Sequence, residues 1–208
     1  MSHGFGRTRW KRFALVLVTS VAAAGAVGVG MAQGALAASF LISGRTFQVS
    51  ADTLDVRGLS IYGMVDVTRE GTAVPVTVTG FRHAEISGLC QSVVVPIPVL
   101  GPYTLRLTGG GGEQRAEARN MFIDAQELDV GQANFKAIDM GVAAGAVTKG
   151  PINPGDKQSR YFDPDGVAQQ ADAARLTDVE VTAVAVSAAT LNVPDLSMRL
   201  RQGSHECF

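Results

Sequence analysis

The feature that most constrains this chain is a pattern of paired apolar residues that recurs every five positions. Three segments of 13 residues align without gaps: Val49–Ile61 (VSADTLDVRGLSI), Ile123–Phe135 (IDAQELDVGQANF) and Val186–Met198 (VSAATLNVPDLSM). In each segment the apolar residues stand at i, i+2, i+5, i+7, i+10 and i+12. That spacing fits neither a helix nor a plainly alternating strand. It indicates short extended faces, each of which buries two side chains and then turns a corner.

Faces of this kind predict an all-β fold. We expect a short β-solenoid-like domain with irregular insertions, because such a coil is built from short flat faces. The alternative is an antiparallel β-sandwich whose strands carry bends or bulges, which also interrupt strict alternation. A degraded fourth copy spans Thr79–Gln91, residues 73–81 read as a half-buried strand, and residues 167–178 form the one helix candidate. The polar stretch 149–166 is expected to be a long loop.

The first 37 residues differ from the rest of the chain. Residues 7–12 (RTRWKR) carry four positive charges, residues 13–32 are almost entirely apolar, and ALAAS at 35–39 contains small residues in an A-x-A arrangement. This order predicts a signal peptide or N-terminal membrane-anchor helix over 1–37, followed by a single β-rich extracytoplasmic domain over 38–208. Cleavage after Ala37 gives a secreted protein. Without cleavage, residues 13–32 would contact the membrane as an anchor.

The charge balance argues against a nucleic-acid-binding protein. Residues 1–37 hold four of the 18 Lys and Arg residues and none of the 19 acidic ones. The remainder therefore carries 14 positive and 19 negative charges, a formal net charge of −5. Binding to nucleic acids or to anionic membranes is expected to need clustered Lys and Arg.

Two cysteines, Cys90 and Cys207, follow the N-terminal segment. In an oxidising compartment an even pair predicts a disulfide, and this one would fasten the C-terminus. The alternative is a zinc site, because each cysteine has a histidine near it in sequence. Its four ligands would be His83, Cys90, His205 and Cys207, although their spacings are unusual for zinc.

Few residues suggest catalysis. No G-x-S-x-G nucleophile elbow occurs, so a hydrolase would need His83 beside Ser87 or Cys90. Asp163 and Asp165 are spaced like part of a calcium loop but supply too few oxygens for a complete one. A ladder of polar residues at five-residue intervals, Asp124, Asp129, Asn134 and Asp139, is expected to be a solvated outer surface. We therefore expect no metal and no cofactor.

Several segments, taken together, carry a family resemblance. They are FGRTRWKRFALVLV (5–18), AQGALAASF (32–40), LCQSVV (89–94), IDMGVAAG (138–145) and DGVAQQAD (165–172). The chain resembles an uncharacterised family of small exported proteins from Streptomyces and related actinomycetes, some of which carry the label cholesterol esterase. The resemblance implies an exported protein and supplies no catalytic residues.

These observations favour a non-enzymatic structural or interaction role in the cell envelope or outside the cell, with an envelope protein or a lipid as the partner. Two alternatives stay open. One is a lipid-ester hydrolase of the cholesterol esterase type, and the other is a lipid-binding module.

Overall fold

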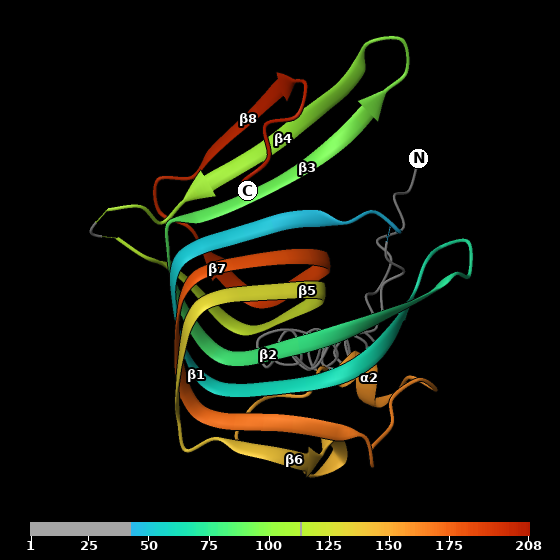
Figure 1. Ribbon diagram of the computed structural model, residues 1–208, viewed down its shortest axis with the longest axis vertical. Coiled ribbons are helices and arrows are strands. Elements are labelled where there is room, and N and C mark those ends of the chain that lie inside the picture. Colours follow the sequence, from blue (N-terminus) through green and yellow to red (C-terminus); the bar gives the residue numbers. More distant parts are fainter. Residues whose placement is uncertain (1–42, 113) are drawn as a thin grey trace, which may run out of the picture. The chain divides into compact units, whose positions relative to one another are not determined.

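The computed structural model describes residues 43–112 and 114–208, and within them the chain is almost entirely β-structure (Figure 1). The expected signal or anchor segment, 1–37, lies outside the described residues. A 3-10 helix, η1 (Ala144–Ala146), and one short helix, α2 (Pro154–Lys157), accompany eight strands. The strands are β1 Phe47–Val67, β2 Ala73–Ser87, β3 Leu89–Ile97, β4 Gly101–Gly109, β5 Ala116–Lys136, β6 Asp139–Ala143, β7 Val167–Asn192 and β8 Ser197–Gln202.

All eight strands belong to one antiparallel sheet, and part of that sheet closes on itself. The strand order is β6-β7-β5-β2-β1-β3-β4-β8, and an additional pairing joins β7 to β1. The ring β1-β2-β5-β7 therefore has no free edge. Its interior holds a core of mainly small and branched apolar side chains, among which Phe81 is the largest.

The five-residue period arises because the long strands bend at regular corners. In β1 the buried pairs Val49/Ala51 and Leu54/Val56 point into the core, and Leu59 begins the next pair. Between such pairs the ladder skips a position. β1 and β2 pair at Arg57↔His83 and next at Leu59↔Phe81. The prediction of two inward residues followed by a corner is thus confirmed in β1.

The corners need backbone conformations that few residues adopt. Gly58 has φ +67°, and a Cβ there would lie 2.6 Å from the Arg82 side chain. Asn120 (φ 44°) and Asp178 (φ 52°) occupy equivalent corners of β5 and β7. Asn and Asp are the side chains that best tolerate this left-handed region after glycine.

The all-β class is confirmed, and so is the antiparallel pairing of the alternative fold, but the strands form one sheet rather than the two of a sandwich. The arrangement is not a solenoid either. Successive coils of a solenoid stack in parallel, whereas hairpins reverse this chain and every strand pairing is antiparallel. The helix expected over 167–178 was also wrong, because these residues form the first half of β7. There β7 pairs with both β1 and β5, and this tertiary pairing overrides the local preference.

The loop between β6 and β7 covers part of the outer face of the closed sheet. A second apolar cluster lies beneath it and includes Tyr62, Val78, Phe122 and Ile152. The loop is fixed by polar contacts: Ser60 Oγ donates to the Pro151 carbonyl, and Arg82 Nη2 donates to the Thr148 carbonyl at 2.8 Å. Residues 149–166 thus form the expected loop, which contains only the single turn of α2.

Beyond the closed ring the sheet continues as three strands, β3, β4 and β8. We call these strands, together with the C-terminal tail Gly203–Phe208, the wing. β3 joins the ring only through its first residues, at Gln48↔Ser92 to Ser50↔Cys90, so the β3–β4 hairpin extends away from the ring (Figure 1). Within residues 43–112 and 114–208, no helix is long and apolar enough to cross a membrane.

Candidate functional site

The wing is held together by the disulfide Cys90–Cys207, which confirms the predicted pairing. The two Cα atoms are 6.0 Å apart and 117 positions apart in sequence. Polar contacts continue the attachment of the tail. The Cys207 amide donates to Ser92 Oγ (3.0 Å), and the His205 amide donates to Thr104 Oγ1 (3.0 Å). The tail therefore lies against one face of β3 and β4 and buries Ser92 and Thr104.

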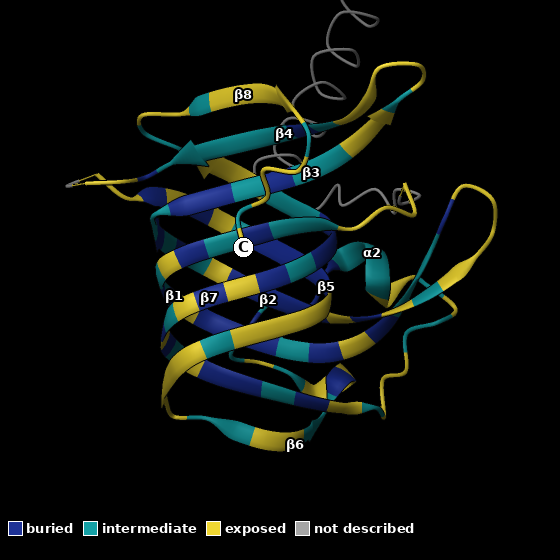
Figure 2. Cartoon of the chain, turned by 45° about the horizontal axis from the view of Figure 1, so that its top comes forward, coloured by how far each residue is buried: buried dark blue, intermediate teal, exposed yellow. Residues whose placement is uncertain are grey.

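The outer end of the β3–β4 hairpin is apolar and exposed. We call Val95–Tyr103 (VPIPVLGPY) the apolar tip. No charged residue occurs between Gln91 and Arg106. Val99 is 104% exposed and Leu100 57% exposed, and Figure 2 shows this end of the hairpin largely in the exposed colour. Exposed apolar residues scattered singly are ordinary on protein surfaces, whereas those of the tip form one contiguous group.

The backbone at this tip is strained. The Leu100 amide donates to the Ile97 carbonyl (3.2 Å), which closes a turn with Pro98 and Val99 at its centre. Val99 has φ 74°, the conformation that a type II turn requires at its third residue and that normally selects glycine. A β-branched residue there is a genuine outlier, so the turn keeps an apolar side chain at a cost in stability.

The apolar tip is continuous with one face of the wing. Strand pairing places Val93, Leu105 and Leu200 side by side, and Leu107 beside Met198. Met198 and Leu200 are 61% and 58% exposed on the edge strand β8. The opposite face of the same strands carries the polar side chains and the tail.

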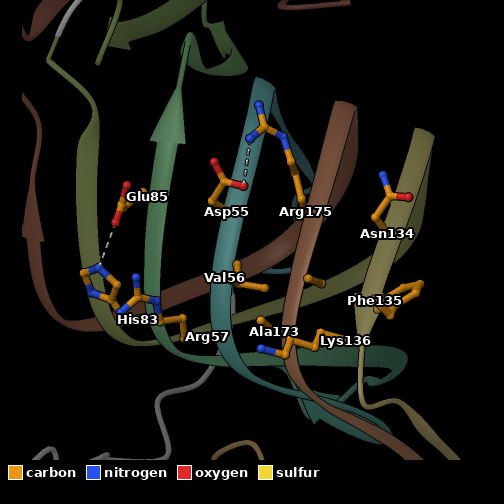
Figure 3. Close-up of a pocket in the computed structure, with 11 residues that line it drawn as sticks. Asp55, Val56, Arg57, His83, Glu85, Asn134, Phe135, Lys136, Ala173 and Arg175 are labelled. Carbon is orange, nitrogen blue, oxygen red and sulfur yellow. Dashed lines mark ion pairs between the residues drawn. The ribbon is translucent and has the colours of Figure 1, made fainter.

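His83 lies on the outer face of the ring, in an open, charged depression of about 430 Å³ (Figure 3). Its Nε2 is 3.5 Å from Glu85 Oε1, whereas its buried Nδ1 has no hydrogen-bond partner in the described part of the chain. Arg115 is 2.7 Å from Asp55 and 3.8 Å from Glu85, and thus links these carboxylates. The depression is an ion-paired surface in which an imidazole meets a carboxylate.

The structure does not bring the two candidate nucleophiles to His83. Ser87 is four residues along the same extended strand, which corresponds to about 13 Å at roughly 3.3 Å per residue. Cys90 lies beyond the corner at Gly88, and its sulfur is bonded to Cys207 in the disulfide. Hydrogen-bond reach between base and nucleophile is about 3 Å.

The candidate metal ligands also fall in separate places. The two cysteines of the predicted zinc site are bonded to each other in the disulfide. The two histidines lie apart: His205 Nε2 is 3.1 Å from the Gln202 carbonyl oxygen in the wing, whereas His83 lies on the ring. In the calcium candidate, Asp163 Oδ1 accepts the Asp165 amide (3.0 Å), which is a local turn contact. Across the described residues no group of three or more His, Cys, Asp or Glu side chains is placed to hold a metal ion.

A buried acid cluster beneath the 149–166 loop is not apparent from the sequence pattern. Asp124, expected on a solvated surface, is only 8% exposed because this loop covers it. Burial, with the nearby charges of Asp66 and Asp156, raises the pKa of Asp124 to about 8. Burial raises the pKa of Asp66 to about 6. Asp124 Oδ1 and Asp66 Oδ2 have no partner among the hydrogen-bond donors of the described residues, which fits two carboxyls that share a proton.

The other members of the acid cluster bind it to the loop. Tyr62 Oη donates to Asp156 Oδ2 (2.7 Å) and accepts from the Asn153 amide (3.1 Å). Burial also raises the pKa values of Tyr62 and Asp156. Two other members of the expected ladder, Asp129 and Asn134, are exposed. Asp139 forms an ion pair with Lys149 at 2.8 Å, and hydrogen bonds from Lys149 and Gln170 lower its pKa.

No curated protein and no solved structure matches this chain. One family model matches residues 43–208, which cover both the closed ring and the wing. The chain therefore belongs to the family of unknown function DUF6230.

Proposed function

We propose that this protein is a non-enzymatic, extracytoplasmic interaction protein that docks on a lipid surface of the cell envelope through its apolar tip. The observation that carries the proposal is the exposed, uncharged turn that keeps Val99 at positive φ. Glycine would relieve that strain and remove the side chain. If the Val99 side chain enters an apolar environment, the free energy gained by burying it offsets the backbone strain.

The chemistry of the tip suits the surface of a bilayer. Val95, Ile97, Val99 and Leu100 supply the apolar part, and Tyr103, three residues beyond the turn, has the amphipathic ring that favours the headgroup level. Three prolines restrict the hairpin, so less conformational entropy is lost when it docks. A protein partner with an apolar groove is the competing occupant, and the experiment below distinguishes it.

The expected affinity is modest. Full burial of one large aliphatic side chain is worth about 1.5–3 kcal/mol, and partial burial of four is worth on the order of 5 kcal/mol. A single myristoyl chain gives similarly marginal, reversible attachment. Docking by the tip would therefore orient the protein on a membrane, and a second contact would have to make it stable.

Export is consistent with this role. The basic and apolar N-terminal segment predicts passage out of the cytoplasm, and the disulfide between Cys90 and Cys207 is of a kind that persists in oxidising compartments. A surface made by a rigid closed sheet with a projecting hairpin suits presentation to a partner.

The test places a fluorescent reporter at the tip. In Leu100→Trp, added phosphatidylcholine–phosphatidylglycerol vesicles are expected to shift tryptophan emission to the blue, and brominated lipids should quench it. The matched control is Thr72→Trp, because Thr72 is an exposed turn residue at the β1–β2 hairpin. Both variants are used as the cell exports them, so any contribution from Trp10 is common to both.

A second pair of variants tests whether the tip is needed. Val99→Asp with Leu100→Asp should abolish tip docking, whereas Thr72→Asp with Ala73→Asp adds the same charge at the other hairpin. Unchanged emission of the Leu100→Trp protein with vesicles, or equal responses from both tryptophan variants, would refute docking by the tip. Saturable binding to an envelope protein that only the tip aspartates remove would assign the tip to the competing occupant.

A further inference from the structure

We propose that a cationic pocket on the polar face of the wing binds a phosphate group. The pocket has a volume of about 220 Å³ and lies between β4, β8 and the C-terminal tail. It is lined by the guanidinium groups of Arg106, Arg199 and Arg201, by the imidazole of His205, and by the hydroxyl groups of Thr104, Thr108 and Ser197. The inference deepens the proposed docking and relies on it only for the source of the phosphate.

Strand pairing sets the arginines close together. Arg106 lies directly opposite Arg199, and Arg201 lies opposite Thr104 one row nearer the tip. Like charges directly opposite each other on neighbouring strands are destabilising. In the part of the chain that the structure describes, none of these three guanidinium groups forms an ion pair with a carboxylate. A bound anion would offset this repulsion.

The pocket favours phosphate through its donors. A guanidinium group presents a planar fork that binds two oxygens of a phosphate or carboxylate at once. Three such forks approach from two strands, and the hydroxyls of Thr108 and Ser197 face each other across the strand pair. Donors on several sides match a tetrahedral anion with three or four oxygens better than a planar carboxylate with two.

The disulfide helps to build the pocket. Arg106 Nε donates to Cys90 Sγ (3.2 Å), so the disulfide fixes one end of that guanidinium group. His205 is two residues before Cys207, and its ring is held near the Gln202 carbonyl. The disulfide thereby orients one of the three guanidinium groups and the imidazole, and we assign it a positioning role at this pocket.

The pocket is also placed for a lipid headgroup. Arg201 pairs with Thr104 of β4. Gly101, in the apolar tip, lies three residues before Thr104. At roughly 3.3 Å per residue this separation is about 10 Å along the hairpin. If the tip inserted as far as the boundary of the acyl chains, Arg201, the arginine nearest the tip, would lie at the level of the lipid phosphates. The wing would then meet the membrane at two depths, with apolar side chains below and arginines above.

The first experiment measures inorganic phosphate alone. When inorganic phosphate is titrated into the exported protein at pH 7 and the heat is measured by calorimetry, we expect one saturable site. Sulfate should compete with phosphate for that site. Arg199→Gln with Arg201→Gln should weaken phosphate binding at least tenfold. The control, Arg57→Gln with Arg69→Gln, removes two exposed arginines outside the wing and should change binding less than twofold. If the wing arginines destabilise the fold when replaced, His205→Ala serves as the second variant, with an expected severalfold loss.

The second experiment identifies the source of the phosphate. If the source is a headgroup, vesicles with phosphatidylglycerol should bind more tightly than pure phosphatidylcholine, and the Arg199/Arg201 variant should lose that preference. Binding of inorganic phosphate without any vesicle binding would support the pocket, assign it to soluble or polymer phosphate, and refute tip docking. Absence of saturable phosphate binding by the wild type, or equal loss in the control variant, would overturn the pocket.

Discussion

Asp124→Asn should remove most of the pH dependence of the stability of this protein. In the folded state the pKa of Asp124 is raised to about 8, whereas the unperturbed value is 3.8. A carboxyl whose folded pKa is raised binds its proton more tightly in the folded state than in the unfolded state. The contribution of this proton to the free energy of unfolding is therefore complete below about pH 4, and it is lost as the pH rises through about 8.

The magnitude follows from the width of that window. Between pH 5 and pH 8 the folded protein retains a proton that the unfolded chain releases, and each pH unit costs about 1.4 kcal/mol. The wild type should therefore lose up to about 4 kcal/mol of unfolding free energy over this range. Asp66, whose pKa is raised to about 6, shares its proton with Asp124, so the two carboxyls titrate as a pair and the sum of both effects is not expected.

The asparagine variant keeps a neutral side chain at every pH, and its amide can donate to Asp66. We expect the variant to match the wild type at pH 5 within about 1 kcal/mol and to be more stable by a few kcal/mol at pH 8.5. Urea unfolding of the oxidised protein at pH 5, 6.5, 8 and 8.5 measures this. The control is Asp129→Asn, which alters an exposed carboxylate of the same strand. A wild type whose stability is flat over this range, or an asparagine variant with an unchanged slope, would refute the reasoning.

Two further predictions concern the disulfide and the loop. Replacement of Cys90 and Cys207 by serine should reduce the unfolding free energy by about 5 kcal/mol in the chain-entropy model, because the bond closes a loop of more than 100 residues; a lower urea midpoint would show this, and an unchanged midpoint would contradict it. Gly150→Ala places a Cβ 2.3 Å from the backbone of Leu59, so it should push the 149–166 loop outward at a cost of about 2 kcal/mol or more. Gly63→Ala, which meets nothing within 4 Å, is the control, and equal melting temperatures for the two variants would contradict the steric argument.

The apolar pairs of β1 could be predicted from the sequence because a corner every five residues leaves its mark on the hydrophobic pattern. In the other two copies the prediction was partly wrong, because several of their expected inward residues are exposed: Leu128, Phe135, Leu191, Leu196 and Met198. The antiparallel pairing could not, because two inward residues and a corner look alike whichever way the neighbouring strand runs. The same corners explain the wrong helix. In β7 the buried residues Ala168, Ala171 and Ala174 are three apart, which imitates a helical stripe. In the structure, the step from Ala171 to Ala174 spans the place where the ladder with β1 skips Asp172, whereas Ala168 packs in the second apolar cluster, on the opposite face of the strand.

The candidate sites were predicted unevenly for a related reason. The disulfide follows from the number of cysteines and the expected compartment. The buried acid cluster could not be predicted in this way, because Asp124 occupies an outward position in its repeat. That position is shielded from water only when the distant 149–166 loop packs over it. The arginine pocket was hidden by the net negative charge. Arg106 and Arg199 are nearly 100 residues apart in sequence and become neighbours only through the pairing of β4 with β8.

The departures from ordinary folding rules are not spread evenly, and this distribution supports the assignment of function to the wing. Most of the ring obeys those rules: its edges are closed, its core is apolar, and its corners use Gly, Asn or Asp, apart from Ala137 (φ 51°) at the end of β5. Of the buried polar atoms of the ring without a partner among the described residues, those of Asp66 and Asp124 can be satisfied by a shared proton, which leaves His83 Nδ1. The wing instead combines a β-branched residue at positive φ, exposed apolar side chains on one face of an edge strand, and two arginines opposite each other. Each costs stability in the isolated protein, and natural sequences keep such features mainly at functional sites. A lipid surface would bury the first two and its phosphates would neutralise the third, so a single partner accounts for all three.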